Sequence, residues 1–242
     1  MSHNSDGVVK STALSVPKAR LQMPIRRPFV PMRPDETQIA ALCVSGRSIY
    51  HHLPGVDAFD SRRDARTFKG RCPVVAHPPC RTWSKYLRQF AKPLDLKAEQ
   101  DLARWCVATV IENGGVLEQP AGSHLWADQN LPMPNRAPRN PFLYSIYVEQ
   151  GWFGNPSDKP TWLLISGVPR RHLPPMPYNL AERGSMTGLS QAARSRTMSA
   201  FAEWLCQVAR LSWWQHGRKT EGQDSGGVNQ SRSYPILARR FS

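Results

Sequence analysis

The chain lacks several features that would place it in a familiar class of protein. No apolar run approaches the roughly 18 residues that a membrane-spanning helix requires. The N-terminal segment has no apolar stretch of the kind found in secretory signals. The five cysteines are odd in number and form no Cys-x-x-Cys pair, which argues against a disulfide framework and a zinc ribbon. We therefore expect a soluble, cytoplasmic protein with reduced thiols.

Acidic residues are outnumbered in this chain. Against 18 Asp and Glu stand 32 Lys and Arg, which gives a formal net charge of +14. Such a balance is typical of proteins that bind a polyanion, most often nucleic acid, although the excess could serve solubility alone. With 242 residues and a hydrophobic content of 40%, the chain is long enough for one α/β domain with a substantial core.

The two ends of the chain differ in composition from the middle. Residues 1–34 are rich in proline, arginine and serine without a sustained hydrophobic period, so we predict a flexible basic arm there. Within it, Arg26 and Arg27 are candidate contacts for nucleic acid. Residues 215–242 are mostly polar, with glycine and serine, and predict a disordered tail. The folded domain is thus expected between residues 35 and 214.

Short apolar runs alternate with amphipathic segments in that middle part. The predicted strands lie at 39–44, 55–60, 72–77, 116–118, 145–149 and 161–166, and the predicted helices at 96–113 and 197–211. Asn113-Gly114-Gly115 is a typical helix end. This order predicts an α/β fold with a mainly parallel sheet and helices on both faces. In such sheets, ligands bind beyond the carboxyl ends of the strands.

One predicted strand leads into the loop His77-Pro78-Pro79-Cys80-Arg81. The two prolines fix the backbone torsion φ and hold the Cys80 thiol in one place. Positive neighbours such as Arg81 and a protonated His77 would favour the nucleophilic thiolate. A proline-rigid turn with an incidental cysteine is the alternative. We interpret Cys80 as a candidate nucleophile.

A second strand ends in a carboxylate, Glu118, which Pro120 follows closely. Because two apolar residues precede it and a proline turn comes after it, we expect Glu118 to be partly buried. Burial raises the pKa of a carboxyl group, so Glu118 is a candidate proton donor near neutral pH. The alternative is a glutamate that accepts backbone hydrogen bonds and organises the turn.

These two loops carry a resemblance to a known family. PPCRTWS is similar to the PPCQxFS nucleophile loop of DNA cytosine-5 methyltransferases, and LEQP resembles that family's ENV segment. The chain resembles more closely a set of short phage and prophage proteins of this lineage, whose pattern includes GVDxxDxxRDAR, VVAHPPCRxW and GGVLEHP. The likeness covers roughly residues 40–212, with WFGNPSDKPTWL among its segments. A phage or prophage protein in a bacterial host is what this resemblance implies.

The resemblance implies a Rossmann-like, methyltransferase-type fold and a covalent reaction on a pyrimidine base. Cys80 would attack C6 of cytosine while Glu118 protonates or hydrogen-bonds N3, and C5 would then accept a methyl group from S-adenosylmethionine. Lys159, with Arg81 as a lesser candidate, would stabilise negative charge. The target base must leave the DNA stack or already be single-stranded.

A cofactor site is also implied, at the ends of the first strands. The glycine-rich turn that cradles the methionine part of S-adenosylmethionine in the family is absent, and this stretch of the chain has the single Gly46. Acidic residues at the end of a second strand can bind ribose hydroxyls in Rossmann-like sites. The candidate cofactor residues are Ser48, Tyr50, Asp57, Asp60 and Pro78.

The stretch between residues 167 and 196 is too short for a separate target-recognition domain. Its Arg170, Arg171 and Arg194 are candidate phosphate contacts, which supply little sequence reading. Specificity would come from the basic arm or from a protein partner. LEQP also lacks the asparagine of ENV that buttresses the acid loop. No metal site is expected, because histidine and cysteine ligands at suitable spacing are missing.

Two other functions stay open. A catalytically degenerate relative would keep the fold and the basic surface as a nucleic-acid-binding or host-interfering module, without turning over S-adenosylmethionine. Related pyrimidine chemistry with another one-carbon donor, or on a nucleotide, is the other alternative. The absent glycine-rich turn is the feature on which these alternatives depend.

Overall fold

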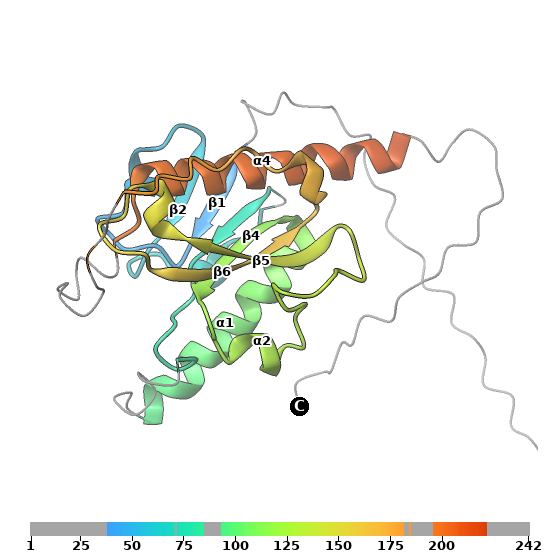
Figure 1. Cartoon of the computed structure of the whole chain (residues 1–242). Helices are drawn as coiled ribbons and strands as arrows, with labels where there is room; N and C mark the ends of the chain where they lie inside the picture. Colours follow the sequence, from blue (N-terminus) through green and yellow to red (C-terminus); the bar gives the residue numbers. More distant parts are fainter. Residues whose placement is uncertain (1–37, 71, 85–92, 182–183, 185–195, 222–242) are drawn as a thin grey trace, which may run out of the picture. The chain divides into compact units, whose positions relative to one another are not determined.

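The computed structural model describes residues 38–70, 72–84, 93–181, 184 and 196–221 (Figure 1). The predicted basic arm with Arg26 and Arg27 lies outside the described residues, as do Arg194 and the tail beyond residue 221. None of the helices in the described part of the chain has the length and apolar character needed to cross a membrane.

A six-stranded mixed sheet forms the framework, with strand order β2-β1-β3-β4-β6-β5. β1 pairs in parallel with β2 and with β3, and β3 pairs in parallel with β4. β6 is antiparallel to both of its neighbours, β4 and β5. In chain order the strands are β1 (Ile39–Leu42), β2 (Val56–Phe59), β3 (Val74–Ala76), β4 (Gly115–Pro120), β5 (Leu143–Glu149) and β6 (Pro160–Ser166).

The expectation of a mainly parallel sheet is therefore wrong, although the strands themselves lie where the apolar runs predicted them. The parallel ladders are short, and the two antiparallel ladders contain more residue pairs. Parallel neighbours need a crossover of about a dozen residues or more, usually a helix. Residues 150–159 supply a shorter link between β5 and β6, so β6 turns back along β5 and also pairs with β4.

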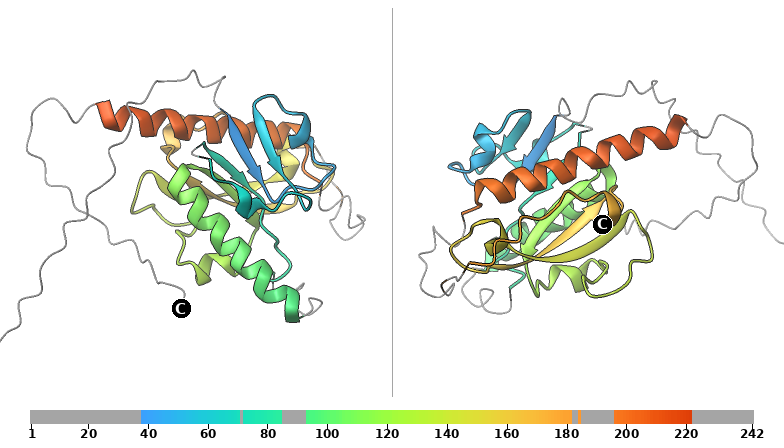
Figure 2. Two further views of the ribbon diagram at one scale, coloured as in Figure 1. Left: turned by 180° about the vertical axis from the view of Figure 1, so that it is seen from behind. Right: turned by 45° about the horizontal axis from the view of Figure 1, so that its top comes forward.

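Long helices cover both faces of the sheet, as predicted (Figure 2). α4 (Ser199–Glu221) packs on one face and α1 (Pro93–Asn113) on the other. Successive strand residues point to opposite faces. In β1, Ile39 accordingly belongs to the core beneath α4, and its neighbour Ala40 belongs to the core beside α1.

Two glycines turn the chain from α1 into β4. Gly114 and Gly115 have positive φ values of 79° and 121°. A Cβ atom on Gly115 would lie 2.0 Å from the carbonyl oxygen of Val74 in β3, so the close approach of β4 to β3 requires glycine. The predicted helix end is thus confirmed, and it fixes where Glu118 lies along β4.

The alternation of strands and helices is less regular than predicted. Short 3-10 turns stand in place of helices after β1, β2 and β5, and a single helical turn follows β4. α4 also runs past residue 214, where the folded domain was expected to end, so the first part of the predicted disordered tail is helical. These short elements are η1 (Ile49–His52), η2 (Ala65–Thr67), α2 (Leu125–Asp128) and η4 (Gln150–Phe153).

Candidate functional site

Several of the predicted functional residues lie in the loops where the central strands end. From β1 the chain continues to β2 on one side, whereas β3 and β4 lie on the other side. Loops that leave a sheet in opposite directions open a crevice between them, and α/β sheets bind ligands at such a switch point. Here the loop after β1 carries Ser48, the loop after β2 begins with Asp60, and the loop after β3 carries Cys80.

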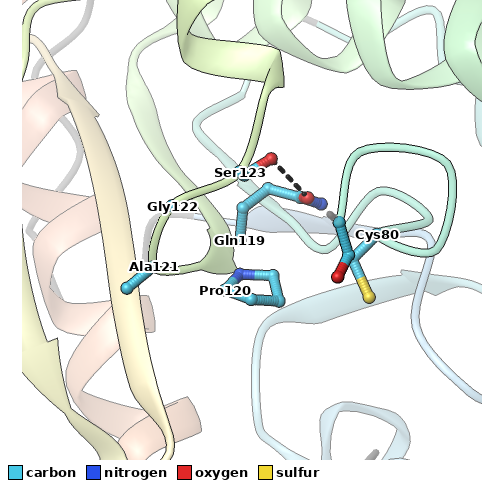
Figure 3. Close-up of a pocket in the computed structure, with 7 residues that line it drawn as sticks. Cys80, Gln119, Pro120, Ala121, Gly122 and Ser123 are labelled. Carbon is cyan, nitrogen blue, oxygen red and sulfur yellow. Dashed lines mark hydrogen bonds between the residues drawn. The ribbon is translucent and has the colours of Figure 1, made fainter. Parts of the chain in front are cut away.

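Cys80 is half-buried and lines a pocket of about 200 Å³ (Figure 3). The turn that ends β4 forms much of the remaining wall. Since successive strand residues face opposite ways, Gln119 lines this pocket and its neighbour Glu118 does not. The lining residues are Cys80, Ser84, Gln119, Pro120, Ala121, Gly122 and Ser123.

Gln119 joins the two predicted loops. Its buried side chain donates a hydrogen bond from Nε2 to the carbonyl oxygen of Pro78 over 2.6 Å, and its Oε1 accepts one from Ser123 Oγ over 3.2 Å. The sequence expectation was that LEQP loses a buttress in this loop. The asparagine is indeed absent, and Gln119, the residue after Glu118, reaches across to the loop of Cys80 and braces it.

Glu118 is held at both carboxylate oxygens. Its Oε2 lies 3.1 Å from Nδ1 of His77, and its Oε1 accepts a hydrogen bond from Nε2 of Gln150 over 3.0 Å. The same amide nitrogen donates to Oγ1 of Thr161 over 3.1 Å. The other ring nitrogen of His77, Nε2, lies 2.9 Å from the hydroxyl of Tyr50. Side chains from four separate segments therefore form one continuous network, Tyr50–His77–Glu118–Gln150.

The pKa of Glu118 is lowered, which is opposite to the sequence expectation. Burial raises this pKa, but the hydrogen bond and charge of His77, the charge of Lys159 and the hydroxyl of Thr161 outweigh burial. Glu118 is therefore ionised at neutral pH and accepts hydrogen bonds. A proton that Glu118 passes to a ligand must first reach this carboxylate, from a neighbouring side chain or from water.

The surroundings of Cys80 also differ from the expectation of a thiolate among positive charges. Burial raises the pKa of the Cys80 thiol, the charge of Glu118 raises it further, and Lys159 lowers it in part. Arg81 extends to α1, where its Nη2 lies 2.6 Å from Oε1 of Glu99. Cys80 is thus a thiol at neutral pH, and Lys159 is the cation that favours its thiolate.

Lys159 precedes β6 and adopts a positive φ of 43°. Its Nζ donates to the carbonyl oxygen of Arg196 over 3.4 Å. Because Lys159 lowers the pKa values of both Cys80 and Glu118, these three predicted catalytic residues act on one another electrostatically. The fourth, Arg81, is not among the main causes of either shift.

Two of the predicted cofactor residues, Ser48 and Asp60, lie at the ends of β1 and β2. The turn after β1 approaches Asp60 closely, since a Cβ on Gly46 would lie 3.2 Å from Oδ2 of Asp60. Asp60 accepts the backbone N–H of Arg62 over 2.9 Å, and this bond is the main reason that its pKa is lowered. An ionised carboxylate in this position suits the hydroxyl groups of a ribose.

The other three predicted cofactor residues are engaged elsewhere. Both oxygens of Asp57 accept hydrogen bonds from Arg63, over 2.5 and 3.0 Å. Tyr50 is fully buried, and its hydroxyl belongs to the network of Glu118. Pro78 is buried, and its carbonyl oxygen accepts the hydrogen bond from Gln119. Of the five predicted cofactor residues, Asp60 thus keeps an ionised carboxylate at the end of β2, and the turn after β1 has the single Gly46 in place of a glycine-rich cradle.

Two predicted phosphate contacts, Arg170 and Arg171, are described, in η5 (Arg170–His172). Arg170 Nη2 donates to the carbonyl oxygen of Ser145 over 3.0 Å, and its guanidinium carbon lies 5.0 Å from the centre of the Tyr144 ring. Arg171 Nε lies 3.2 Å from the ring of His172. Arg170 thus braces β5 in this structure.

Sequence reasoning missed Gln119 and Gln150 and assigned Tyr50 to a cofactor. A usable signal existed for Gln150, since it directly follows a predicted strand that ends at the same sheet edge as Glu118. Within the described part of the chain, no group of three or more His, Cys, Asp or Glu side chains is placed to hold a metal ion. No model of a known protein family matches the chain, and no curated protein is significantly similar to it.

Proposed function

We propose that this chain is a compact, Rossmann-like enzyme of the DNA cytosine-5 methyltransferase type, with S-adenosylmethionine as methyl donor. The strand order supports the fold, because β1 has β2 on one side and β3 and β4 on the other, as in doubly wound sheets. One observation carries the chemistry. Cys80 and Glu118 lie at the ends of the paired strands β3 and β4, whose loops Gln119 joins.

In the proposed reaction, the sulfur of Cys80 forms a bond to C6 of cytosine. The C5–C6 double bond is lost, and N3 takes up a proton that arrives through Glu118. C5 is then the nucleophilic carbon of an enamine. After it gains a methyl group, it loses its proton to water, the C5–C6 double bond re-forms, and the sulfur leaves C6 as the Cys80 thiolate. Lys159 stabilises the thiolate before the attack and negative charge on the base afterwards.

S-adenosylmethionine, when bound, supplies that methyl group. Asp60 would accept the hydroxyl groups of its ribose, and Ser48 lies in the neighbouring turn. Both positions are at the ends of β1 and β2, next to the loop that carries Cys80. The donor and the target base would then share the switch-point crevice.

DNA is the proposed partner, and the net charge of +14 supports a polyanion. The cytosine would have to leave the stack to reach the sulfur of Cys80. Since no separate target-recognition domain is expected, we propose that the basic N-terminal segment or a protein partner directs the enzyme to its sites. The proposed setting is the cytoplasm of a bacterial host, as a phage or prophage protein.

A trapping experiment tests this function. DNA that contains 5-fluorocytosine is incubated with the full chain and S-adenosylmethionine, and a covalent complex is sought on a denaturing gel. Fluorine replaces the proton that C5 must lose, so the sulfur–C6 bond persists. We expect an adduct with the wild-type chain, none with Cys80→Ala, and a normal amount with Cys72→Ala. Cys72 is a suitable control because it is also half-buried, with its pKa raised by burial. Absence of the wild-type adduct would contradict the proposal.

A second candidate is a degenerate module that binds nucleic acid without turning over S-adenosylmethionine. The engagement of Asp57 by Arg63 and the single Gly46 in the turn after β1 favour it. Calorimetric titration separates the two candidates. Heat on addition of S-adenosylmethionine is expected for the enzyme, and DNA binding without such heat is expected for the module.

A further inference from the structure

The side chains of Tyr50, His77 and Glu118 form a row that the reaction outlined above does not explain. The Tyr50 hydroxyl lies 2.9 Å from Nε2 of His77, and Nδ1 of His77 lies 3.1 Å from Oε2 of Glu118. Tyr50 is fully buried, whereas the side chains of His77 and Glu118 are 12% and 13% exposed. A titratable group thus connects a buried phenol with the carboxylate on β4.

His77 is the titratable side chain in direct hydrogen-bond contact with Glu118. On its other oxygen, Glu118 meets the amide of Gln150, which cannot exchange charge. Two further groups interact with Glu118 through charge alone. Lys159 lowers the pKa of Glu118, and Glu118 raises the pKa of the Cys80 thiol. Tyr50, on the far side of His77, has Cys206 of α4 as its other titratable neighbour. Any proton that reaches Glu118 within this network therefore comes through His77.

We propose that His77 is the proton source of Glu118, with Tyr50 as a positioning residue that holds the imidazole. The proposal rests on the function proposed above, because it supplies the proton that N3 of the cytosine takes up. It explains how a carboxylate that is ionised at rest serves as a proton donor.

The proton balance is simple. Protonated His77 gives its Nδ1 proton to Oε2 of Glu118, and Glu118 passes a proton to N3. His77 ends as a neutral imidazole that keeps its Nε2 proton, and Glu118 ends as a carboxylate. When N3 gives up its proton at the end of the reaction, the proton returns along the same path.

The hydroxyl of Tyr50 suits both states of the imidazole. Nε2 keeps its proton in both states, and the hydroxyl oxygen accepts a hydrogen bond from it. Burial raises the pKa of Tyr50 well above its ordinary value, so the phenol keeps its proton and orients the ring without supplying charge. Removing this hydroxyl should affect His77 without removing the relay itself.

His77→Asn separates proton supply from mere positioning. The asparagine amide can donate a hydrogen bond to Glu118 from near the place of Nδ1, but it does not titrate. Trapping on 5-fluorocytosine DNA is measured from pH 5.5 to pH 9 with the full chain. We expect the His77→Asn rate to fall about 100-fold, within the range for general acid catalysis. Tyr50→Phe should lose about two- to tenfold, as for one hydrogen bond.

The pH profile is the decisive readout. The wild-type rate should rise with pH as Cys80 ionises, and should level off where imidazoles lose their second proton, ordinarily between pH 5 and 8, because the gain of thiolate is then offset by the loss of imidazolium. This levelling-off should be absent in His77→Asn, whose rate should keep rising up to pH 9 as Cys80 ionises. The exposed His52→Asn is the matched control and should keep the wild-type profile, and urea unfolding checks that each variant is folded. A His77→Asn variant with wild-type rate and profile would overturn the proposal.

Nitrogen-15 NMR of labelled histidine gives a readout that needs no reaction. The His77 signals are identified by their absence in His77→Asn. We expect a proton on Nδ1 in the wild type at neutral pH, and loss of that preference in Glu118→Leu. A bare Nδ1 facing Glu118 would overturn the relay alone. A protonated Nδ1 with no DNA adduct would overturn the proposed function, and the relay's role with it.

Discussion

Glu118 and Gln119 are consecutive residues of β4, yet they belong to different networks. Glu118 contacts His77, a titratable partner, on the side of the sheet that α4 covers. Gln119 contacts the Pro78 carbonyl on the other side, and its partners are neutral. The alternation of side chains along a strand separates the two. At this end of β4, Glu118 thus belongs to the network with a titratable partner, and Gln119 braces the loop that carries Cys80.

This difference makes the two residues sensitive to different perturbations. Changes in pH should act on the Glu118 side, because its hydrogen bonds involve charged groups. The contacts of Gln119 with Pro78 and Ser123 should be sensitive to loss of side-chain volume or of hydrogen bonds. The resulting loss of stability should be the same at every pH at which the chain is folded. The predictions below test that separation.

The largest effect is expected from Glu118→Gln. The variant keeps the shape of the side chain but removes the acid, so the rate of adduct formation on 5-fluorocytosine DNA should fall by about 100-fold or more. Glu149→Gln, at the end of β5, is the matched control and should react at close to the wild-type rate. A Glu118→Gln rate within a few-fold of wild type would remove the carboxyl from the mechanism.

Gln119→Leu should destabilise the fold by about 1–3 kcal/mol, because it leaves the Pro78 carbonyl without its buried partner. Urea unfolding measures this free energy. The loss should be the same at pH 5 and pH 8, since no titratable group takes part. Gln207→Leu, on the exposed face of α4, should change stability by about 0.5 kcal/mol or less. Equal losses in the two variants would show that the brace contributes nothing.

Acid should reduce the stability that the ionised Glu118 carboxylate contributes to the fold. The folded-state pKa of Glu118 lies below its ordinary value of about 4.5. The ionised group therefore stabilises the fold above pH 4.5, and this contribution is lost as the pH falls through the lowered pKa. The unfolding free energies of wild type and Glu118→Gln should accordingly converge between pH 5 and pH 3. A difference that grows in acid would mean that burial, not pairing, dominates this pKa.

Arg81→Gln should have the smallest effect. Arg81 pairs with Glu99 at a partly exposed site, and such pairs contribute about 0–1 kcal/mol. The rate of adduct formation should change by about threefold at most, because this side chain points to α1. Glu99→Gln should give the same small loss of stability. A large loss of rate in Arg81→Gln alone would return this residue to the catalytic set that the sequence predicted.

Much of the fold could be predicted because the signals are local. The run at 39–44 forms β1, and the glycines after the first long helix end it where expected. The position of β6 between β4 and β5 could not be predicted in this way. This position depends on which strand edge is free to pair and on how far the short link between β5 and β6 reaches. The spacing of hydrophobic residues along the chain contains neither piece of information.

The places of Cys80 and Glu118 in the fold could be predicted from the sequence, but the directions of their pKa shifts could not. Cys80 and Glu118 follow apolar runs and precede turns, which placed them correctly at strand ends. Their pKa values were predicted in the wrong direction. Arg81 is adjacent to Cys80 in the chain but pairs with Glu99, while Lys159, far along the chain, acts on the thiol. Adjacency in the chain therefore does not show which charged groups shift the pKa of a residue.

The sequence by itself determined the buried strands, the two long helices, and the placement of a sulfur and a carboxylate at neighbouring strand ends. Periodicity, proline and glycine act over a few residues, so they can be read locally. Only the tertiary structure decided that His77 meets Glu118 and that Gln119 braces Pro78. Hydrogen bonds and pKa values depend on distances between side chains, and folding brings together side chains that lie far apart in the chain.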